Sequence, residues 1–305
     1  MQLKYDIANI EKGEGVKSLR SFIEGKRNTE TVWCDWNIPL HWGGVSDPFQ
    51  PIEREHRLSY EALKVFAETQ YPFVVSTKNT MLAEPEYLEL LKQCNCVVQV
   101  SAVGTKYDSL EAGAPTYEER LKMIETIAPH VKRVIIRVQP YTTEMLTATL
   151  AAIPRYKEIG VHGITIEGMK YKRKITGLVK VGGDFCYPVE VLKRHFEQIR
   201  EKCHVNGLSF YSAENRLRKM GDSLCCCGVD GLEGYDTNMY NLNHYLYDND
   251  NFTPTEKMNE VGTSQCLKAM CQNALSVSAF RKLSLAEIIR VMSKDKNSIS
   301  QLIEK

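Results

Sequence analysis

The sequence has 305 residues, of which 43% are hydrophobic and 25% are charged, and its formal net charge is +1. This length permits one large domain or two modest ones, and the composition is that of an ordinary globular protein. The small net charge excludes a globally basic chain that coats nucleic acid, so any anion-binding surface must be local.

No apolar run approaches the roughly 18–20 residues that a membrane span requires. The N-terminal stretch MQLKYDIANIEKGEG lacks the apolar core of a secretory signal. We therefore expect a cytoplasmic protein without membrane contact, whose ten cysteines are mostly reduced thiols or metal ligands.

Short β-rich runs alternate with helical patterns over residues 1–212. Several of these runs are nearly continuous in Val and Ile, which is typical of strands buried on both faces of a parallel sheet. The expected strands are Glu30–Asp35, Pro72–Thr77, Cys96–Val103, Arg133–Val138, Gly163–Glu167 and Gly207–Tyr211.

In the segments between the expected strands, apolar residues recur at the spacing of a helix. Pro85 suits a first helical turn, and Thr116 with Glu119 has the pattern of a capping box. Strand–helix alternation at roughly 25–35 residues predicts an α/β fold with a parallel sheet, either a barrel or a doubly wound sheet. The expected helices are Gly15–Gly25, Leu58–Thr69, Pro85–Gln93, Tyr117–Ala128, Thr143–Ile159 and Val189–Lys202.

The pattern changes after residue 212. Residues 213–262 are rich in Gly, Asp, Asn and Tyr, which favours an irregular, loop-rich segment. Residues 263–305 predict two C-terminal helices, Ser264–Leu283 and Ser284–Lys305, with Ser284 as an N-cap. We expect these helices to extend the barrel of residues 1–212 rather than to form an independent domain.

In a parallel α/β barrel, functional residues lie on loops at the carboxyl ends of the strands. The segment HWGGVSDPFQPIE, residues 41–53, follows the first expected strand. Gly43 and Gly44 permit close approach of a ligand to the backbone, and Ser46 and Asp47 supply a hydroxyl and a carboxylate. The alternative is a turn with aromatic core packing.

Further strand ends carry charged residues. Lys78 directly follows the second strand and is a candidate anion contact, and Ser101 lies at the end of the third, with Glu111 beyond it. Arg137 lies within an apolar run, where a charged group needs a partner or a ligand. Glu111 is the alternative, purely structural partner for it.

Five short segments occur in an order that resembles the spore photoproduct lyase and DNA-repair-photolyase-like branch of radical S-adenosylmethionine enzymes. They are SDPFQPIE, STKN, VSAV, LEAGAPTYEERL and RVQPY, within residues 30–170. The resemblance implies a partial parallel (β/α)6-type barrel and S-adenosylmethionine as cofactor. It also implies a [4Fe–4S] cluster held by CxxxCxxC, and hydrogen abstraction by a 5′-deoxyadenosyl radical from nucleic acid or a related substrate. By the same resemblance, the cofactor-binding residues are Gly43, Gly44, Ser46, Asp47, Lys78, Ser101, Glu111 and Arg137.

The sequence departs from this group in two respects. CxxxCxxC occurs nowhere in the 305 residues, and the first cysteine is Cys34, whereas the motif belongs before residue 30. Gly44 stands where the lyase has a hydrogen-donating cysteine, which weakens the expectation of a thymine-dimer substrate.

The missing motif leaves several interpretations open. We expect a fragment that lacks the first strand and the cluster loop, so that Glu30–Asp35 is the second strand of the barrel. The alternatives are a separate polypeptide that carries the cluster segment, and a descendant that has lost the chemistry. The latter would be a non-catalytic module that binds S-adenosylmethionine or a nucleotide.

Cys225, Cys226 and Cys227 are adjacent in a loop. Two of them, with Cys186 or Cys203, could hold a metal or an auxiliary cluster. One could instead be a redox-active thiol, and the remaining interpretation is unpaired thiols.

A short basic run follows the strand Gly163–Glu167, where it could contact the phosphates of a nucleic acid. The alternative is a solvated loop. Tyr211, Glu214 and Asn215 follow the last strand and are further candidates for the same edge. The basic residues of the run are Lys170, Lys172, Arg173 and Lys174.

Overall fold

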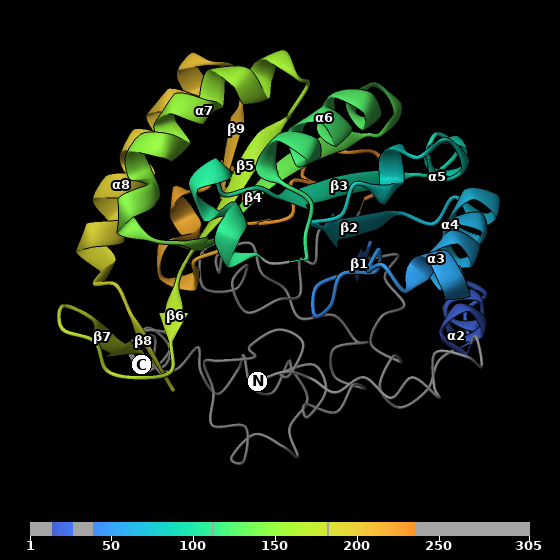
Figure 1. Cartoon of the computed structure of the whole chain (residues 1–305), viewed down its shortest axis with the longest axis horizontal. Helices are drawn as coiled ribbons and strands as arrows, with labels where there is room; N and C mark the ends of the chain where they lie inside the picture. The colour runs from blue at the N-terminus through green and yellow to red at the C-terminus, as the bar shows by residue number, and fades with distance from the viewer. Residues whose placement is uncertain (1–13, 27–38, 112, 182, 236–305) are drawn as a thin grey trace, which may run out of the picture.

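The computed structural model describes residues 14–26, 39–111, 113–181 and 183–235 (Figure 1). Its main element is a six-stranded sheet in the order β1-β2-β3-β4-β5-β9, in which all neighbouring strands are parallel. The strands are β1 (Leu40–Trp42), β2 (Phe73–Thr77), β3 (Cys96–Ser101), β4 (Arg133–Tyr141), β5 (Gly163–Gly168) and β9 (Ser209–Ser212).

Helices cover one face of this sheet, along an arc that follows the strand order (Figure 1). Because each strand lies beside its predecessor, the chain always winds in one direction, as in a barrel; a doubly wound sheet reverses direction. The expected α/β fold with a partial barrel is thus confirmed. The longer helices are α2 (Glu14–Ile23), α4 (Leu58–Thr69), α5 (Pro85–Leu91), α6 (Tyr117–Ile127), α7 (Leu146–Glu158) and α8 (Val189–Val205).

The main core lies between the sheet and the helices. Alternate strand residues point toward the helices, where Val75, Val98 and Ile136 are fully buried. A second, smaller apolar layer lies on the opposite face, which we call the inner face. It consists of Val74, Val97, Ile135, Tyr211, Val229 and Tyr235. Residues beyond the last strand therefore pack beneath the sheet.

The expected strands after the first agree with the observed ones to within a few residues. Glu30–Asp35 lies outside the described residues. The edge strand is Leu40–Trp42, whose last two residues lie in the segment expected to be a loop, and its register pairs Leu40 with Phe73. Three residues are too few to show a strand period, so the sequence pattern missed it. The capping box of Thr116 and Glu119 at the start of α6 is confirmed.

A second sheet follows β5 and was not expected. It has three antiparallel strands in the order β6-β8-β7, namely β6 (Lys170–Tyr171), β7 (Val179–Val181) and β8 (Asp184–Cys186). The helices expected over residues 263–305 lie outside the described residues, as does the later part of the segment 213–262. Among the described helices, none has the length and apolar character to cross a membrane.

Candidate functional site

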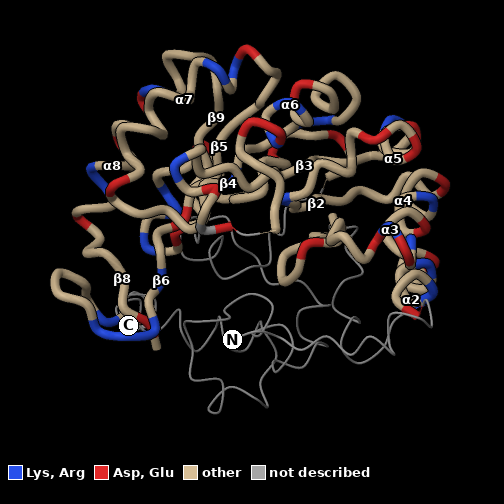
Figure 2. The backbone as a smooth tube through the Cα atoms, in the orientation of Figure 1, with Lys and Arg blue, Asp and Glu red and all other residues tan. Residues whose placement is uncertain are grey.

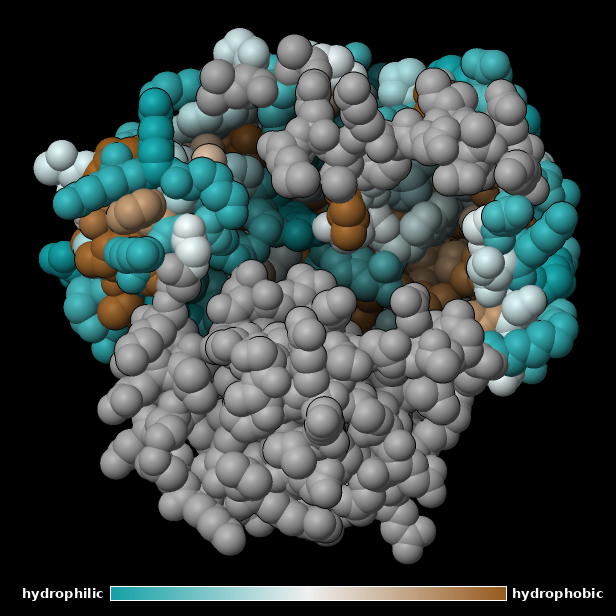
Figure 3. Space-filling model, turned by 90° about the horizontal axis from the view of Figure 1, so that it is seen from below, coloured by the Kyte–Doolittle hydropathy of each residue, from teal (hydrophilic) through white to brown (hydrophobic). Residues whose placement is uncertain are grey.

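The inner face carries polar side chains toward the carboxyl ends of the strands. Strand alternation explains their position, because Ser76, Gln99 and Arg137 each lie two residues beyond a member of the inner apolar layer. Seen from below (Figure 3), hydrophilic side chains line the middle of a hollow in the described part of the molecule, with hydrophobic ones beside it.

One half of this polar row is centred on Ser76. The Ser76 hydroxyl lies 2.8 Å from Nε2 of His41 and donates to Oε1 of Gln99 at 3.0 Å. A guanidinium nitrogen of Arg137 donates to the same hydroxyl at 3.3 Å. Burial lowers the pKa of His41, and the nearby charge of Arg137 lowers it further, so His41 is neutral at pH 7.

The other half of the row runs from Arg137 toward β6. Nε of Arg137 donates to Oε1 of Gln139 at 2.5 Å, and the Gln139 amide donates to Glu167. Glu167 also forms an ion pair with Lys170. The polar row therefore extends across the inner face from β1 to β5. Within the described residues, the guanidinium of Arg137 contacts neutral oxygens and no carboxylate.

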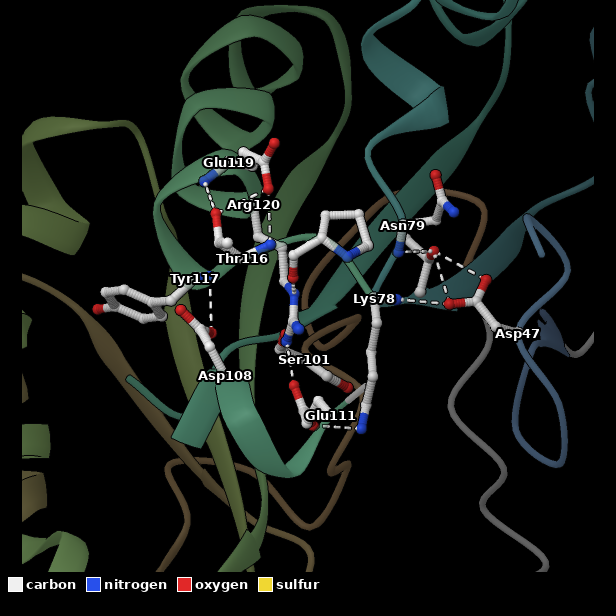
Figure 4. A network of polar contacts seen from close by, with 12 residues as sticks. Asp47, Lys78, Asn79, Ser101, Asp108, Glu111, Thr116, Tyr117, Glu119 and Arg120 are labelled. Atoms are coloured by element: carbon white, nitrogen blue, oxygen red, sulfur yellow. Dashed lines mark hydrogen bonds and ion pairs between the residues drawn. The ribbon is translucent and has the colours of Figure 1, made fainter. Parts of the chain in front are cut away.

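A second polar network adjoins this row (Figure 4). Glu111 lies between Lys78 and Arg120, and its Oε2 is 2.6 Å from a guanidinium nitrogen of Arg120. Arg120 is only 1% exposed, and it also donates to the carbonyl oxygens of Pro115 and Ser101, at 2.8 and 2.9 Å. The partner of Glu111 is thus not Arg137, which was the structural alternative.

The electrostatics of Glu111 are decided by its two cationic partners. Burial alone would raise the pKa of this carboxyl, but hydrogen bonds from Lys78 and Arg120 outweigh burial and hold the pKa below its usual value. Glu111 is therefore ionised at neutral pH and fixes both cations at the carboxyl edge of the sheet.

Asp47 attaches the loop after β1 to the end of β2. Its carboxylate accepts hydrogen bonds from the backbone of Lys78 at 2.6 Å, the hydroxyl of Thr77 at 2.9 Å and the backbone of Phe49 at 2.9 Å. Gly43 has φ +87°, and a Cβ there would lie 2.3 Å from the carbonyl oxygen of Ser76. This loop can approach β2 only with glycine at that position.

The remaining predicted residues of the loop are less constrained. A Cβ on Gly44 would make only ordinary contacts, the nearest at 3.6 Å from His41. The Ser46 hydroxyl accepts a hydrogen bond from Gln50 at 2.8 Å. Of the predicted cofactor-binding residues, the structure therefore brings together Asp47, Lys78, Ser101 and Glu111, as Figure 4 shows, and it places Arg137 in the adjoining row.

The three adjacent cysteines do not meet the two others proposed as co-ligands. Cys186 lies in β8 beside Arg216 and Glu214, and Cys203 lies in α8 near Asp222. No group of three potential ligands within the described ranges could hold a metal ion. A metal at Cys225–Cys227 stays a prediction from sequence.

The basic run forms β6 and the turn after it (Figure 2). Lys170 pairs with Glu167, and Lys172, although largely exposed, lies 2.6 Å from Asp184. Arg173 and Lys174 are exposed. Part of the positive charge of this run is therefore neutralised within the small sheet.

Of the residues expected to follow the last strand, Tyr211 lies within β9 and the other two lie after it, and all three have contacts within the fold. Tyr211 stacks on His162 within the inner apolar layer, away from the carboxyl edge. Glu214 lies 2.9 Å from Arg216, and Asn215 accepts a hydrogen bond from Arg218.

Sequence reasoning missed His41, Ser76, Gln99, Gln139 and Glu167. Ser76 and Gln99 are single polar residues within apolar strands, and such an interruption is a signal that could have identified them.

No family model and no curated protein matches this sequence. A variant of spore photoproduct lyase superposes with a TM-score of 0.48 at 12% identity, over 65% of this chain and 67% of the lyase chain. The lyase complexed with dinucleoside spore photoproduct gives 0.45 at 13% identity, over 64% and 72%. SuiB from Streptococcus suis, bound to S-adenosylmethionine, gives 0.37 at 14%, over 55% and 37%. The feature shared with these structures is the fold alone.

Proposed function

We propose that this chain is a cytoplasmic radical S-adenosylmethionine protein that binds its cofactor at the carboxyl edge of the six-stranded sheet. One observation carries the proposal. The five segments that resemble the spore photoproduct lyase branch lie at the carboxyl ends of β1 to β4 or in the loops that follow them. Separate stretches of sequence thus converge on one edge, where ligands bind in parallel α/β folds.

The side chains at this edge suit the polar groups of S-adenosylmethionine. Arg137 has only neutral partners among the described residues, so its guanidinium can bind a ligand carboxylate. Glu167 and Gln139 provide acceptors for an ammonium group or a ribose hydroxyl. Thr165, which pairs with Arg137 in the sheet register, has a buried hydroxyl without a partner.

The same residues do not fit a [4Fe–4S] cluster. The sequence has no CxxxCxxC, and the described residues contain no group of three ligands with suitable geometry. Cluster ligation, which would supply the reductive cleavage of the cofactor, belongs in this proposal to a segment outside the 305 residues, on the same or on a separate polypeptide. The role assigned to this chain is to bind and orient the cofactor.

We further propose a nucleic acid or a related molecule as substrate. Residues 170–186 contain five basic residues and one acidic residue, 5 − 1 = +4, whereas the whole chain has a net charge of +1. This concentration of charge follows β5 directly, and Arg173 and Lys174 are exposed.

Calorimetric titration of the full chain with S-adenosylmethionine tests the proposed site. Arg137→Met should weaken binding by about tenfold or more, because it removes a charge-assisted contact. Arg155→Met is the matched control, since Arg155 lies on α7 and pairs with Glu118 at the surface. Equal affinities for the two variants, or no binding by the wild type, would contradict the proposal.

The second candidate, a non-catalytic binding module, is favoured because the sequence has no CxxxCxxC and the described residues contain no group of three metal ligands. Anaerobic treatment with iron and sulfide separates the two functions. A version of the chain extended at its N-terminus by a CxxxCxxC segment should incorporate iron and bind S-adenosylmethionine more tightly if the radical function is correct. A binding module would show the same affinity with and without the extension.

A further inference from the structure

The small sheet β6-β8-β7 meets the six-stranded sheet through one charged side-chain contact. Lys170 in β6 forms an ion pair with Glu167 in β5. Within the described ranges, no other hydrogen bond or ion pair joins a side chain of residues 170–186 to the six strands. The nearby Lys172, for comparison, pairs with Asp184 inside the small sheet. The Lys170–Glu167 pair is therefore the point at which the polar side chains of the two sheets meet.

Glu167 also belongs to the polar row of the inner face. Its Oε2 accepts a hydrogen bond from the Gln139 amide, while its Oε1 faces Lys170. Oε1 of Gln139 in turn accepts from Nε of Arg137 at 2.5 Å. The Glu167 side chain is only 14% exposed, so little water is available to replace these donors. A continuous set of contacts thus leads from Arg137 to the small sheet.

The Gln139 amide has two possible orientations in this set of contacts. With its oxygen toward Arg137 and its nitrogen toward Glu167, both ends are satisfied. Rotation of the amide by half a turn would place its N–H groups against the Nε–H of Arg137 and its oxygen against the carboxylate, and both contacts would be repulsive. The cation at one end and the anion at the other therefore favour the same orientation of one amide.

The backbone around Gln139 is irregular. The pairing of β4 with β5 shifts between Val138 and Tyr141, and such irregular positions redirect side chains beside functional sites. The alternative interpretation is a cross-strand contact that only stabilises this part of the sheet. The two interpretations differ in whether a ligand at Arg137 changes the small sheet.

Arg137 presents another side of its guanidinium to a ligand. Its Nε donates to Gln139 and its Nη1 donates to Ser76, whereas no described residue accepts a hydrogen bond from Nη2. A ligand anion bound to Nη2 restricts the planar guanidinium, and with it the amide that accepts from Nε. The order imposed by the ligand then reaches Glu167 through hydrogen bonds that already exist.

We propose that Gln139, Glu167 and Lys170 form a relay that couples ligand binding at Arg137 to the order of the small sheet. A ligand with a carboxylate, such as S-adenosylmethionine, orders β6 to β8 and the basic turn between β6 and β7. This turn carries the exposed Arg173 and Lys174, so the bound cofactor prepares it for an anionic substrate. The inference rests on the proposed cofactor site and adds its regulation. By linkage, the substrate must tighten cofactor binding by the same factor.

Amide hydrogen exchange of the full chain, measured by mass spectrometry with and without saturating S-adenosylmethionine, tests the relay. In the wild type, the ligand should slow exchange over residues 170–186 by about fivefold or more. Lys170→Met should lose this slowing, while its affinity for the ligand falls by no more than the same factor. Lys170→Arg should restore the slowing. Lys172→Met is the matched control and should keep it, because the partner of Lys172 lies within the small sheet.

The quantity compared is the ratio of exchange rates with and without ligand. A substitution that only loosens the small sheet raises both rates and leaves this ratio unchanged. Calorimetry on the same samples separates two failures. A wild type that binds no S-adenosylmethionine would refute the cofactor site and the relay together. Binding without slower exchange over residues 170–186, or slowing that Lys170→Met retains, would refute the relay alone.

Discussion

At the residue scale, the described part of the candidate site contains a few positions where a substitution should destabilise the folded protein. Gly43 is one, because its positive φ and its approach to Ser76 both exclude a side chain. We predict that Gly43→Ala lowers the free energy of unfolding by about 1–3 kcal/mol. Gly44→Ala, one residue away, should have little effect, because its Cβ would make only ordinary contacts with His41. Urea denaturation of both variants measures the difference, and equal losses would contradict this account of the loop.

Glu111 is a second such position, because it compensates the charge of buried Arg120. We predict that Glu111→Gln destabilises the protein by about 3 kcal/mol at pH 7, since it leaves a buried guanidinium without its counter-charge. Glu118→Gln, which removes a surface partner of Arg155, should cost much less.

The pH dependence of this loss has a definite sign. Folding lowers the pKa of Glu111, so its ionised form contributes full stability above the unfolded pKa of about 4.3. That contribution disappears as the pH falls through the folded pKa. The stabilities of wild type and Glu111→Gln, measured by urea denaturation along a pH series, should therefore converge in acid. A difference that stays constant down to acid pH would show that lost packing, not charge, causes the effect.

At this scale, the sequence identified the charged residues of the candidate site more easily than the residues to which they bind. Lys78, Glu111 and Arg137 were identified because charged residues follow or interrupt apolar strands. That Glu111 binds Lys78 and Arg120 instead of Arg137 depends on the path of residues 102–116, which no period in the sequence specifies. Arg120 itself looked like an ordinary residue of a helix face.

At the element scale, hydrophobic patterning identified β2 to β5 and the helices between them, because each strand is long enough to show a buried run. β1 has three residues, and the strands of the small sheet have two or three, so neither has a detectable period. The small sheet is defined by antiparallel pairing, which is close in sequence between β7 and β8, as in Val181 with Asp184, and more distant between β6 and β8, as in Tyr171 with Phe185.

At the scale of the whole molecule, the sheet and the small sheet should differ in local stability. β2 to β5 have neighbours on both sides and fully buried apolar residues, whereas β6 and β7 are mostly exposed. We predict that amide hydrogen exchange is slowest in β2 to β5 and faster by several orders of magnitude in β6 to β8, because local opening there breaks few buried contacts. Exchange measured by mass spectrometry on proteolytic fragments checks this. Equal protection of β7 and β3 would contradict it.

The strands of the six-stranded sheet lie side by side in the same order in which they occur in the sequence. This order has a consequence for folding during synthesis. Each strand of the six-stranded sheet can dock on the strand of that sheet that precedes it in the sequence, and only β9 is separated from its neighbour β5 by other strands, those of the small sheet. The segment beneath the sheet is made after all six strands. The carbonyl oxygen of its Cys226 faces Gln99 of β3. A hydrogen bond from Cys227 and the charges of Arg218, after β9, and His41, in β1, lower the pKa of the Cys226 thiol. The surroundings that lower this pKa are therefore complete only after all six strands of the sheet have been made.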